Sequence, residues 1–406
     1  MKKRIWQVLT IVLVVMLSVS FVSCGGDDYT DDEKNSQKEK QEEKQEDIID
    51  PYITPLTLEP IDGGYISVTN NALEAITCNL DNGESQIINS GEYKIFFVGK
   101  GCKVSIFGNN ARYYLESYKY TSIRCTSDVY VYGNVMSLIN STNFASLKTL
   151  TEKYTFCRLF VDNEHLKSHP TKELVLPATT LTEGCYKEMF SGCKSLVRSP
   201  SLPATTLAKE CYMEMFYRCS SLFTPPVLPA TAMEQGCYEL MFNYCTSLTT
   251  APELPATIMA KDCYGGMFSN CINLINVQSI LPATELSESC YSTMFRNCEK
   301  LTIAPKLPAT TLQKKCYEYM FDGCVRLTDA PELLAKKLPD YCYYSMFNDC
   351  MSLKYVKCLA TNIGYFSTYK WMENVSASGT FVKDKNKTWN IGSNGIPDNW
   401  TIENAE

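Results

Sequence analysis

One repeated pattern dominates the sequence from Leu176 onward. The pattern LPATTLxxxCYxxMFxxCxSLxxxPx occurs seven times with a period of about 26 residues. Its Cys-Tyr pair marks the register, and successive pairs are separated by 26, 26, 26, 27, 26 and 26 residues. The pairs are Cys185-Tyr186, Cys211-Tyr212, Cys237-Tyr238, Cys263-Tyr264, Cys290-Tyr291, Cys316-Tyr317 and Cys342-Tyr343. A fixed period of this length is typical of stacked supersecondary units, so the sequence predicts a solenoid.

The positions within one unit predict its local structure. We number them from the first cysteine, so that Cys185 is position 1 and Cys193 is position 9 in the first full repeat. On a helix, positions 1, 2, 5, 6 and 9 form one apolar stripe, which predicts a short helix ended by a left-handed residue at position 8. After the leucine at position 12, prolines limit the next stretch to a strand of three or four residues.

The repeat also resembles a known family. The string Phe190-Ser191-Gly192-Cys193-Lys194-Ser195-Leu196, with its six counterparts, is similar to the AFxxCxxL core of BspA-like leucine-rich repeats, which occur on the surfaces of Bacteroidetes, treponemes and some protists. The resemblance covers about half the chain. It implies an α/β solenoid of leucine-rich repeats, with a short helix and a short parallel strand in each unit and the strands on a concave face. This chain departs from the usual unit by about three residues around Pro-Ala-Thr-Thr.

The N-terminus is typical of an exported lipoprotein. Lys2, Lys3 and Arg4 precede an apolar run of about 15 residues, which is short for a membrane-spanning helix. The run ends at Cys24, in a context that resembles a bacterial lipobox; we therefore expect a signal peptide at 1–23 and lipid on Cys24. Residues 24–51 are mostly polar or acidic, which predicts a disordered acidic tether. Together with the resemblance, these features predict a surface-exposed lipoprotein of the outer membrane.

The rest of the chain divides into four predicted parts. Residues 52–137 alternate apolar and polar side chains in short runs, which indicates a small antiparallel β domain of the sandwich kind. This domain could serve as a spacer, an N-terminal cap or a second binding surface. Residues 138–153 form a connector, and 154–360 form the solenoid, with one degenerate unit in which Asn163 replaces the second cysteine. Residues 361–406 hold Trp371, Trp389 and Trp400 and are expected to close the array as a C-terminal cap.

The chain contains 20 cysteines, fourteen of which lie in the seven full repeats. Two cysteines eight residues apart on one helix are too distant for a bridge, so any disulfide would join neighbouring units. Both fall on the buried stripe, which favours reduced, buried thiols. The C-x7-C spacing does not match a zinc site, and we expect no metal or other cofactor. Position 9 resembles the Asn/Cys ladder of leucine-rich repeats, and we expect the tyrosines at position 2 to pack rather than to bind.

Nothing in the sequence predicts catalysis. The chain has two histidines and none of the motifs HExxH, GxSxG, GxxxxGK[ST] or GxGxxG, so we expect a binding protein rather than an enzyme. Residues 51–406 are nearly neutral, which argues against a nucleic-acid partner.

The predicted ligand-binding residues follow the position-12 leucine, where the side chains vary on a constant frame. These candidates for the concave face are Arg198, Phe223, Thr224, Thr250, Asn276, Ile303, Asp329 and Tyr355. Three functions remain open: an adhesin for a host or microbial surface protein, a glycan-binding lipoprotein, and a structural surface antigen without a specific ligand.

Overall fold

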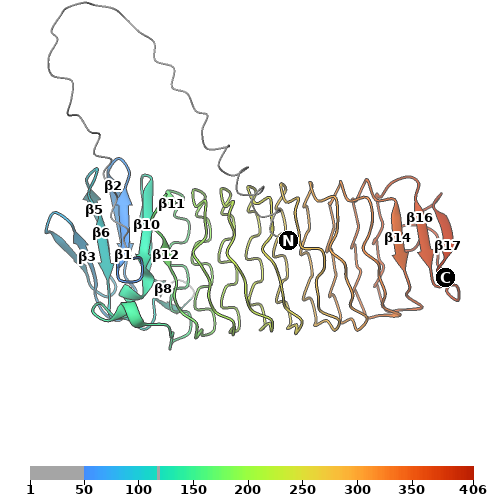
Figure 1. The fold of residues 1–406 in the computed structure, drawn as a ribbon, viewed down its shortest axis with the longest axis horizontal. Helices are drawn as coiled ribbons and strands as arrows, with labels where there is room; N and C mark the ends of the chain where they lie inside the picture. Colours follow the sequence, from blue (N-terminus) through green and yellow to red (C-terminus); the bar gives the residue numbers. More distant parts are fainter. Residues whose placement is uncertain (1–49, 117–118) are drawn as a thin grey trace, which may run out of the picture. The chain divides into compact units, whose positions relative to one another are not determined.

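The computed structural model describes residues 50–116 and 119–406. The predicted signal peptide, Cys24 and nearly all of the predicted tether lie outside the described residues. Residues from Ile49 to Glu406 form one compact unit, in which antiparallel sheets are followed by a row of stacked coils (Figure 1). No helix in the described part of the chain is long and apolar enough to cross a membrane.

Among residues 50–116 and 119–406, ten strands lie before the coils and seven lie within or after them. The first ten are β1 (Leu56–Pro60), β2 (Gly64–Thr69), β3 (Ile76–Leu80), β4 (Ser85–Ile88), β5 (Tyr93–Val98), β6 (Val104–Phe107), β7 (Tyr114–Glu116), β8 (Lys119–Tyr120), β9 (Ser122–Cys125) and β10 (Val129–Asn134). Two 3-10 turns follow, η1 (Val135–Leu138) and η2 (Phe144–Ser146). The others are β11 (Leu166–Ser168), β12 (Leu174–Val175), β13 (Lys337–Leu338), β14 (Tyr355–Cys358), β15 (Asn362–Ile363), β16 (Thr380–Lys383) and β17 (Thr401–Asn404).

The expected antiparallel sheets are present at the N-terminal end. The strand order is β11-β10-β1-β6-β3-β4 in the larger sheet and β5-β2-β9 in the smaller one. Strands β1 to β6 and β9 pair antiparallel, whereas β10 pairs parallel with β11 and β12. Because β11 and β12 belong to the first coil, the sheet and the coils share one continuous hydrophobic core.

The predicted helix in each repeat is wrong. Among the described residues only η1 and η2 are helical, and positions 1 to 9 form a series of tight turns. In the first full repeat the backbone is left-handed at Gly184, Glu188 and Gly192, which are four residues apart. The equivalent residues of the other units also have positive φ, so the expected left-handed residue at position 8 is confirmed, but it is the third of three.

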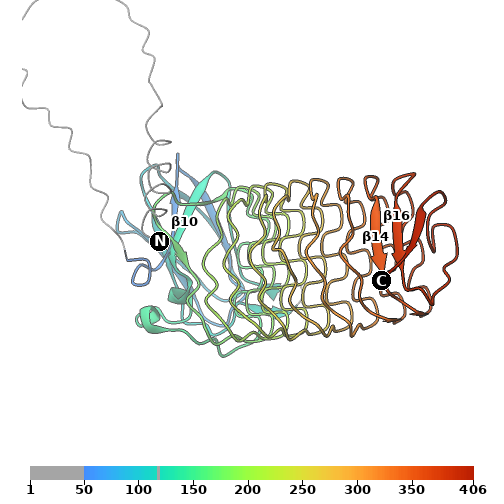
Figure 2. The ribbon, with the colours of Figure 1, turned by 45° about the vertical axis from the view of Figure 1, so that its right-hand side comes forward.

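The backbone hydrogen bonds of these turns alternate between two kinds of partner. The N–H groups of Cys185 and Lys187 donate to carbonyls three residues earlier, at 3.2 and 3.1 Å. The N–H groups of Tyr186 and Glu188 donate to Cys211 and Met213 in the next coil, at 3.0 and 2.9 Å. Every second N–H therefore joins two coils, which lie side by side in Figures 1 and 2. The turns repeat every four residues, whereas an α-helix repeats every 3.6 residues. Over only nine residues both periods place the same side chains on one stripe, so the helix prediction failed.

The buried positions are those predicted. Cysteine, tyrosine, methionine, phenylalanine, cysteine and leucine at positions 1, 2, 5, 6, 9 and 12 are at most 2% exposed in all seven repeats. The phenylalanines from Phe160 to Phe347 stack with ring centroids 5.5 to 5.7 Å apart. The tyrosines from Tyr186 to Tyr343 form a parallel column at 5.7 to 6.0 Å, so they pack in the core as expected.

Other aromatic rings continue the tyrosine column at both of its ends. Phe156 of the degenerate unit stacks on Tyr186 at 5.7 Å, and Tyr113 of the β domain stacks on Phe156 at 6.0 Å. At the other end Trp371 stacks on Tyr343 at 6.1 Å, and Trp389 stacks on Trp371 at 5.4 Å. These rings cover apolar faces that the terminal coils would otherwise expose to water.

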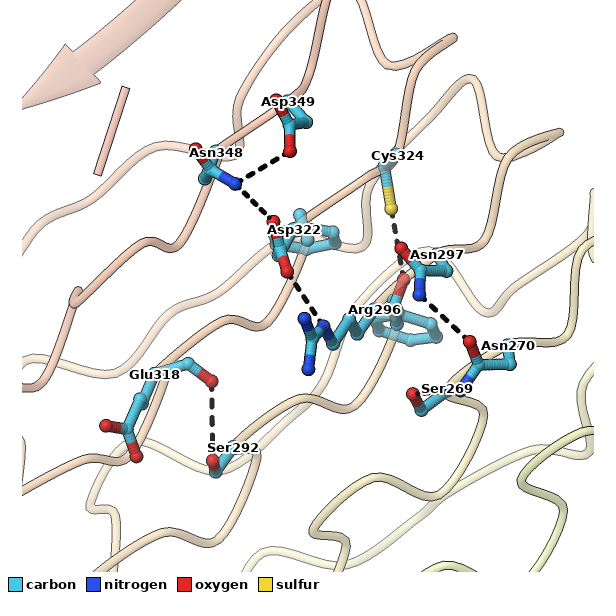
Figure 3. Close-up of polar contacts among 12 residues, drawn as sticks. Ser269, Asn270, Ser292, Arg296, Asn297, Glu318, Asp322, Cys324, Asn348 and Asp349 are labelled. Carbon is cyan, nitrogen blue, oxygen red and sulfur yellow. Dashed lines mark hydrogen bonds and ion pairs between the residues drawn. The ribbon is translucent and has the colours of Figure 1, made fainter. Parts of the chain in front are cut away.

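A polar ladder joins the coils at positions 7 and 8 (Figure 3). Asp322 accepts from Arg296 Nε at 2.8 Å and from Asn348 Nδ2 at 2.7 Å, so its carboxylate links three coils. Asn297 Nδ2 donates to Asn270 Oδ1 at 2.9 Å in the same way. Each contact joins residues one repeat apart, and the ladder therefore holds the coils in register.

Candidate functional site

Six of the eight predicted candidate residues pair between neighbouring coils, whereas Phe223 and Ile303 take part in no bridge. Parallel bridges join Arg198 to Thr224, Thr250 to Asn276, and Asp329 to Tyr355. We call the eight predicted residues the candidate row: Arg198, Phe223, Thr224, Thr250, Asn276, Ile303, Asp329 and Tyr355. The expected strand is shorter than predicted in most of the full repeats, where a single bridge replaces it; β14, which begins at Tyr355, has four residues as predicted. The structure brings six of the predicted residues together in three pairs, and the role of the eight in binding stays a prediction.

The side chains of the candidate row are accessible and chemically varied. Seven of the eight are exposed, and Tyr355 is half-buried. Phe223 is 57% exposed and Ile303 is 76% exposed, although both are large and apolar. Arg198 provides a cation toward one end of the row and Asp329 an anion toward the other. This mixture of apolar, charged and amide groups is suited to a protein surface with matching chemistry.

A hollow that the sequence analysis missed lies beside Arg198. It has a volume of about 190 Å³ and is lined by residues 168–174, by Arg198 to Ser201 and by Thr224, among others. Arg198 closes one side, because its guanidinium donates to the carbonyl oxygens of His169 and, at 3.0 Å, Pro170. Its backbone N–H also donates to Ser168 Oγ at 3.0 Å. The hollow is smaller than a typical ligand pocket, and its size suits one inserted side chain.

Buried polar contacts hold the loop that forms this hollow. His169 is 6% exposed, and its Nδ1 accepts from the N–H groups of Thr171 and Lys172 at 3.2 and 3.0 Å. Lys172 Nζ lies 3.2 Å from Glu59 Oε2 and 4.6 Å from the centroid of the Tyr132 ring. Burial raises the pKa of Glu59, but hydrogen bonds from Tyr132 and Lys172 outweigh it and lower that pKa below its ordinary value. The carboxylate is thus held ionised, and the loop has a fixed shape.

A second face of the coils carries carboxylates at the turn positions. Burial, together with the like charges of Asp262 and Glu214, raises the pKa of Glu239 to about 7. Burial also raises the pKa of Glu214 and of Asp262. Within the described ranges, no group of three or more His, Cys, Asp or Glu side chains is arranged to hold a metal ion.

The repeat cysteines are free, buried thiols, as the sequence analysis favoured. Each position-9 thiol donates to the position-6 carbonyl of the preceding coil, as in Cys245 to Phe216 O at 3.1 Å. In the degenerate unit Asn163 Nδ2 donates to Ile123 O at 3.1 Å, so asparagine takes the same place in the ladder. Burial raises the pKa of these thiols, for example that of Cys271 to about 12. They are protonated at neutral pH and act as structural donors.

Comparison of this chain with family models, with curated proteins and with solved structures gives no match.

Proposed function

We propose that the chain is a surface lipoprotein whose coils form a module for binding another protein. One observation carries this proposal. Six residues of the candidate row pair in parallel bridges between neighbouring coils, while the exposed side chains of the row change from coil to coil. A constant frame with a varied surface is what recognition of a particular partner requires, and exposed Phe223 and Ile303 are natural anchors in such an interface.

The proposed partner is a host or microbial surface protein. The hollow beside Arg198 would accept one of its side chains, and the polar residues of the row would form the surrounding hydrogen bonds. The resemblance to BspA-like leucine-rich repeats supports this class of partner, although the coils lack the helical part that the resemblance implied. Lipid on Cys24 would hold the protein at the outer membrane, and the acidic tether would separate the coils from the lipid surface.

The binding role is tested with the full chain immobilised against a panel of extracellular and cell-surface proteins. We expect saturable binding to at least one of them. Phe223→Ala and Ile303→Ala should each weaken that binding by about fivefold or more, since a central apolar anchor contributes at least about 1 kcal/mol.

Ile258→Ala is the matched control, because Ile258 is 64% exposed but lies on a different ladder, paired with Ala232. Equal loss in Ile258→Ala and Ile303→Ala would count against the candidate row. Absence of saturable binding across the panel would favour a structural surface antigen. The anchor is tested separately, by incorporation of labelled fatty acid, which Cys24→Ser should abolish.

A further inference from the structure

Six aromatic side chains form one surface patch on the last coils. We call Tyr319, Tyr341, Tyr344, Tyr365, Phe366 and Tyr369 the aromatic patch. Tyr344 links its two sides, since its ring lies 5.3 Å from that of Tyr319 and 5.2 Å from that of Tyr369. Tyr341 lies 6.0 Å from Tyr365 and 5.8 Å from Phe366. Three successive coils therefore contribute to one continuous set of rings.

The rings of the aromatic patch are open to solvent, unlike those of the core columns. Tyr365 is 64% exposed and Phe366 is 39% exposed, while Tyr319, Tyr341, Tyr344 and Tyr369 are half-buried. The half-buried rings support one another, which fixes the patch in place without removing it from water. Preformed aromatic surface loses little entropy on binding a ligand.

An open hollow adjoins the aromatic patch. It has a volume of about 580 Å³ and is lined by Leu312, Pro339 and six polar or charged residues: Thr310, Thr311, Gln313, Lys314, Lys337 and Asp340. We call it the lysine hollow. Lys314 Nζ lies 5.8 Å from the centroid of the Tyr341 ring. Asp340 Oδ1 accepts the backbone N–H of Tyr365 at 2.8 Å, so the hollow and the patch are continuous.

The lysine hollow offers hydrogen-bonding groups and positive charge. Within the part of the chain that the structure describes, neither Lys314 nor Lys337 takes part in an ion pair, and both are exposed. Asp340 is the single carboxylate in the lining, so the hollow carries a net positive charge. The side chains of Thr310, Thr311 and Gln313 are exposed as well. The hollow can therefore offer two cations, two hydroxyls and an amide to one ligand.

The six earlier full repeats carry no aromatic ring at the positions of Tyr341 and Tyr344. The residues equivalent to Tyr341 are Gly184, Glu210, Gly236, Asp262, Ser289 and Lys315. Those equivalent to Tyr344 are Lys187, Met213, Glu239, Gly265, Ser292 and Glu318. At these two positions the first six full repeats thus carry charged residues, small residues and one methionine, and among the full repeats the seventh alone carries a tyrosine at both.

We propose that the aromatic patch and the lysine hollow together bind an anionic polysaccharide. The electron-rich faces of tyrosine rings attract the polarised C–H groups of a sugar ring, and exposed rings give such a ring a flat surface to stack on. The carboxylates or sulfates of the polysaccharide would pair with Lys314 and Lys337, and its hydroxyls would bond to the threonines and Gln313. This site is separate from the candidate row, so it does not rest on the proposed protein binding.

The lining favours a polysaccharide over a peptide. Five of the six rings are tyrosines, and six of the eight side chains that line the lysine hollow carry a hydroxyl, amide or charged group. A peptide anchor would require an apolar pocket that excludes water, whereas this hollow is open to solvent and contains exposed charges. An extended, hydroxyl-rich chain fits such an open surface better.

The test is electrophoresis of the purified full chain in native gels that contain heparin, polygalacturonate or neutral dextran. We expect retardation by at least one of the two anionic polysaccharides and none by dextran. Added sodium chloride should reduce the retardation, because salt screens exposed charges. Tyr365→Ala and Lys337→Ala should each weaken the apparent affinity by about fivefold.

Two matched variants serve as controls. Tyr93→Ala removes an equally exposed tyrosine, also 64% exposed, from the β domain, and Lys148→Ala removes an exposed lysine from the connector. Both should leave the retardation unchanged, and so should Ile303→Ala in the candidate row. Absence of retardation in all three gels would overturn the proposal. So would an equal loss in Tyr93→Ala and Tyr365→Ala, or Tyr365-dependent capture of a protein without any polysaccharide binding.

Discussion

Truncating one phenylalanine in the middle of the core column should split the coil array. Phe242 is fully buried and stacks between Phe216 and Phe268, with both centroid distances at 5.7 Å. Phe242→Ala removes the ring from both neighbours. A buried phenylalanine truncated to alanine costs about 3–5 kcal/mol, and the two lost ring contacts place this site toward the upper end of that range.

The loss should be confined to nearby coils. In a stacked array each coil contacts only its neighbours, so a weakened coil lowers the coupling between the two halves. Urea unfolding followed by near-UV circular dichroism should shift to lower urea and separate into two transitions. Hydrogen exchange should accelerate most in the coil of Phe242 and in its two neighbours, and least in the β domain.

Phe223→Ala is the matched control, because Phe223 lies one coil away and is 57% exposed. It should change the free energy of unfolding by no more than about 0.5 kcal/mol. A loss of less than about 1 kcal/mol of unfolding free energy in Phe242→Ala would contradict the proposed role of this ring in the core. Equal destabilisation of Phe242→Ala and Phe223→Ala would contradict it as well. A uniform rise in exchange over the whole chain would refute nearest-neighbour coupling in particular.

Three further predictions concern pH, backbone conformation and thiol reactivity. The pKa of the Glu239 carboxyl is raised from 4.5 to about 7, so the folded state binds the carboxyl proton more tightly than the unfolded state. The contribution of this proton to the free energy of unfolding is therefore present below about pH 4.5 and lost by about pH 7. Glu239→Gln should therefore flatten the fall in unfolding free energy over that window, as measured by urea titration at several pH values; an unchanged slope would contradict it. Gly192→Ala should destabilise the chain by about 1–2 kcal/mol. The reason is that φ of Gly192 is +77° and the added Cβ would lie 2.6 Å from Asp162 Oδ1. An unchanged thermal unfolding temperature would show that the turn is not left-handed in solution. Iodoacetamide should label half-buried Cys102 in the native chain much faster than buried Cys185, because burial raises the pKa of the Cys185 thiol to about 12. Rapid labelling of the repeat thiols, detected by mass spectrometry, would contradict this prediction.

Most residues of the candidate row could be predicted from the sequence. Its residues follow the position-12 leucine, which is buried in all seven full repeats. The residues directly after this leucine are therefore expected to face solvent. Phe223 and Ile303 are exposed for this reason. The hollow beside Arg198 was not predictable, because it needs the loop at 168–174 to fold against a coil about 30 residues later in the chain.

The aromatic patch could not be predicted from the sequence either. Tyr319, Tyr344 and Tyr369 are spaced 25 residues apart in sequence, but Tyr319 lies three residues after Cys316, Tyr344 lies two after Cys342, and the coil of Tyr369 has no such cysteine. Nothing local marks them as neighbours. They meet because stacking places each turn over the preceding one, and only then do isolated tyrosines become one surface.

Sequence alone determined the period, the register and the buried set of this protein. These follow from side-chain hydrophobicity, which needs no knowledge of the partner that buries each residue. The backbone conformation of positions 1 to 9 was decided only by the tertiary structure. A helix satisfies its N–H groups within one segment, whereas here every second N–H bonds to the next coil, as Tyr186 does to Cys211. The choice between helix and turns therefore depends on a neighbour about 26 residues away, and no pattern within a single unit specifies it.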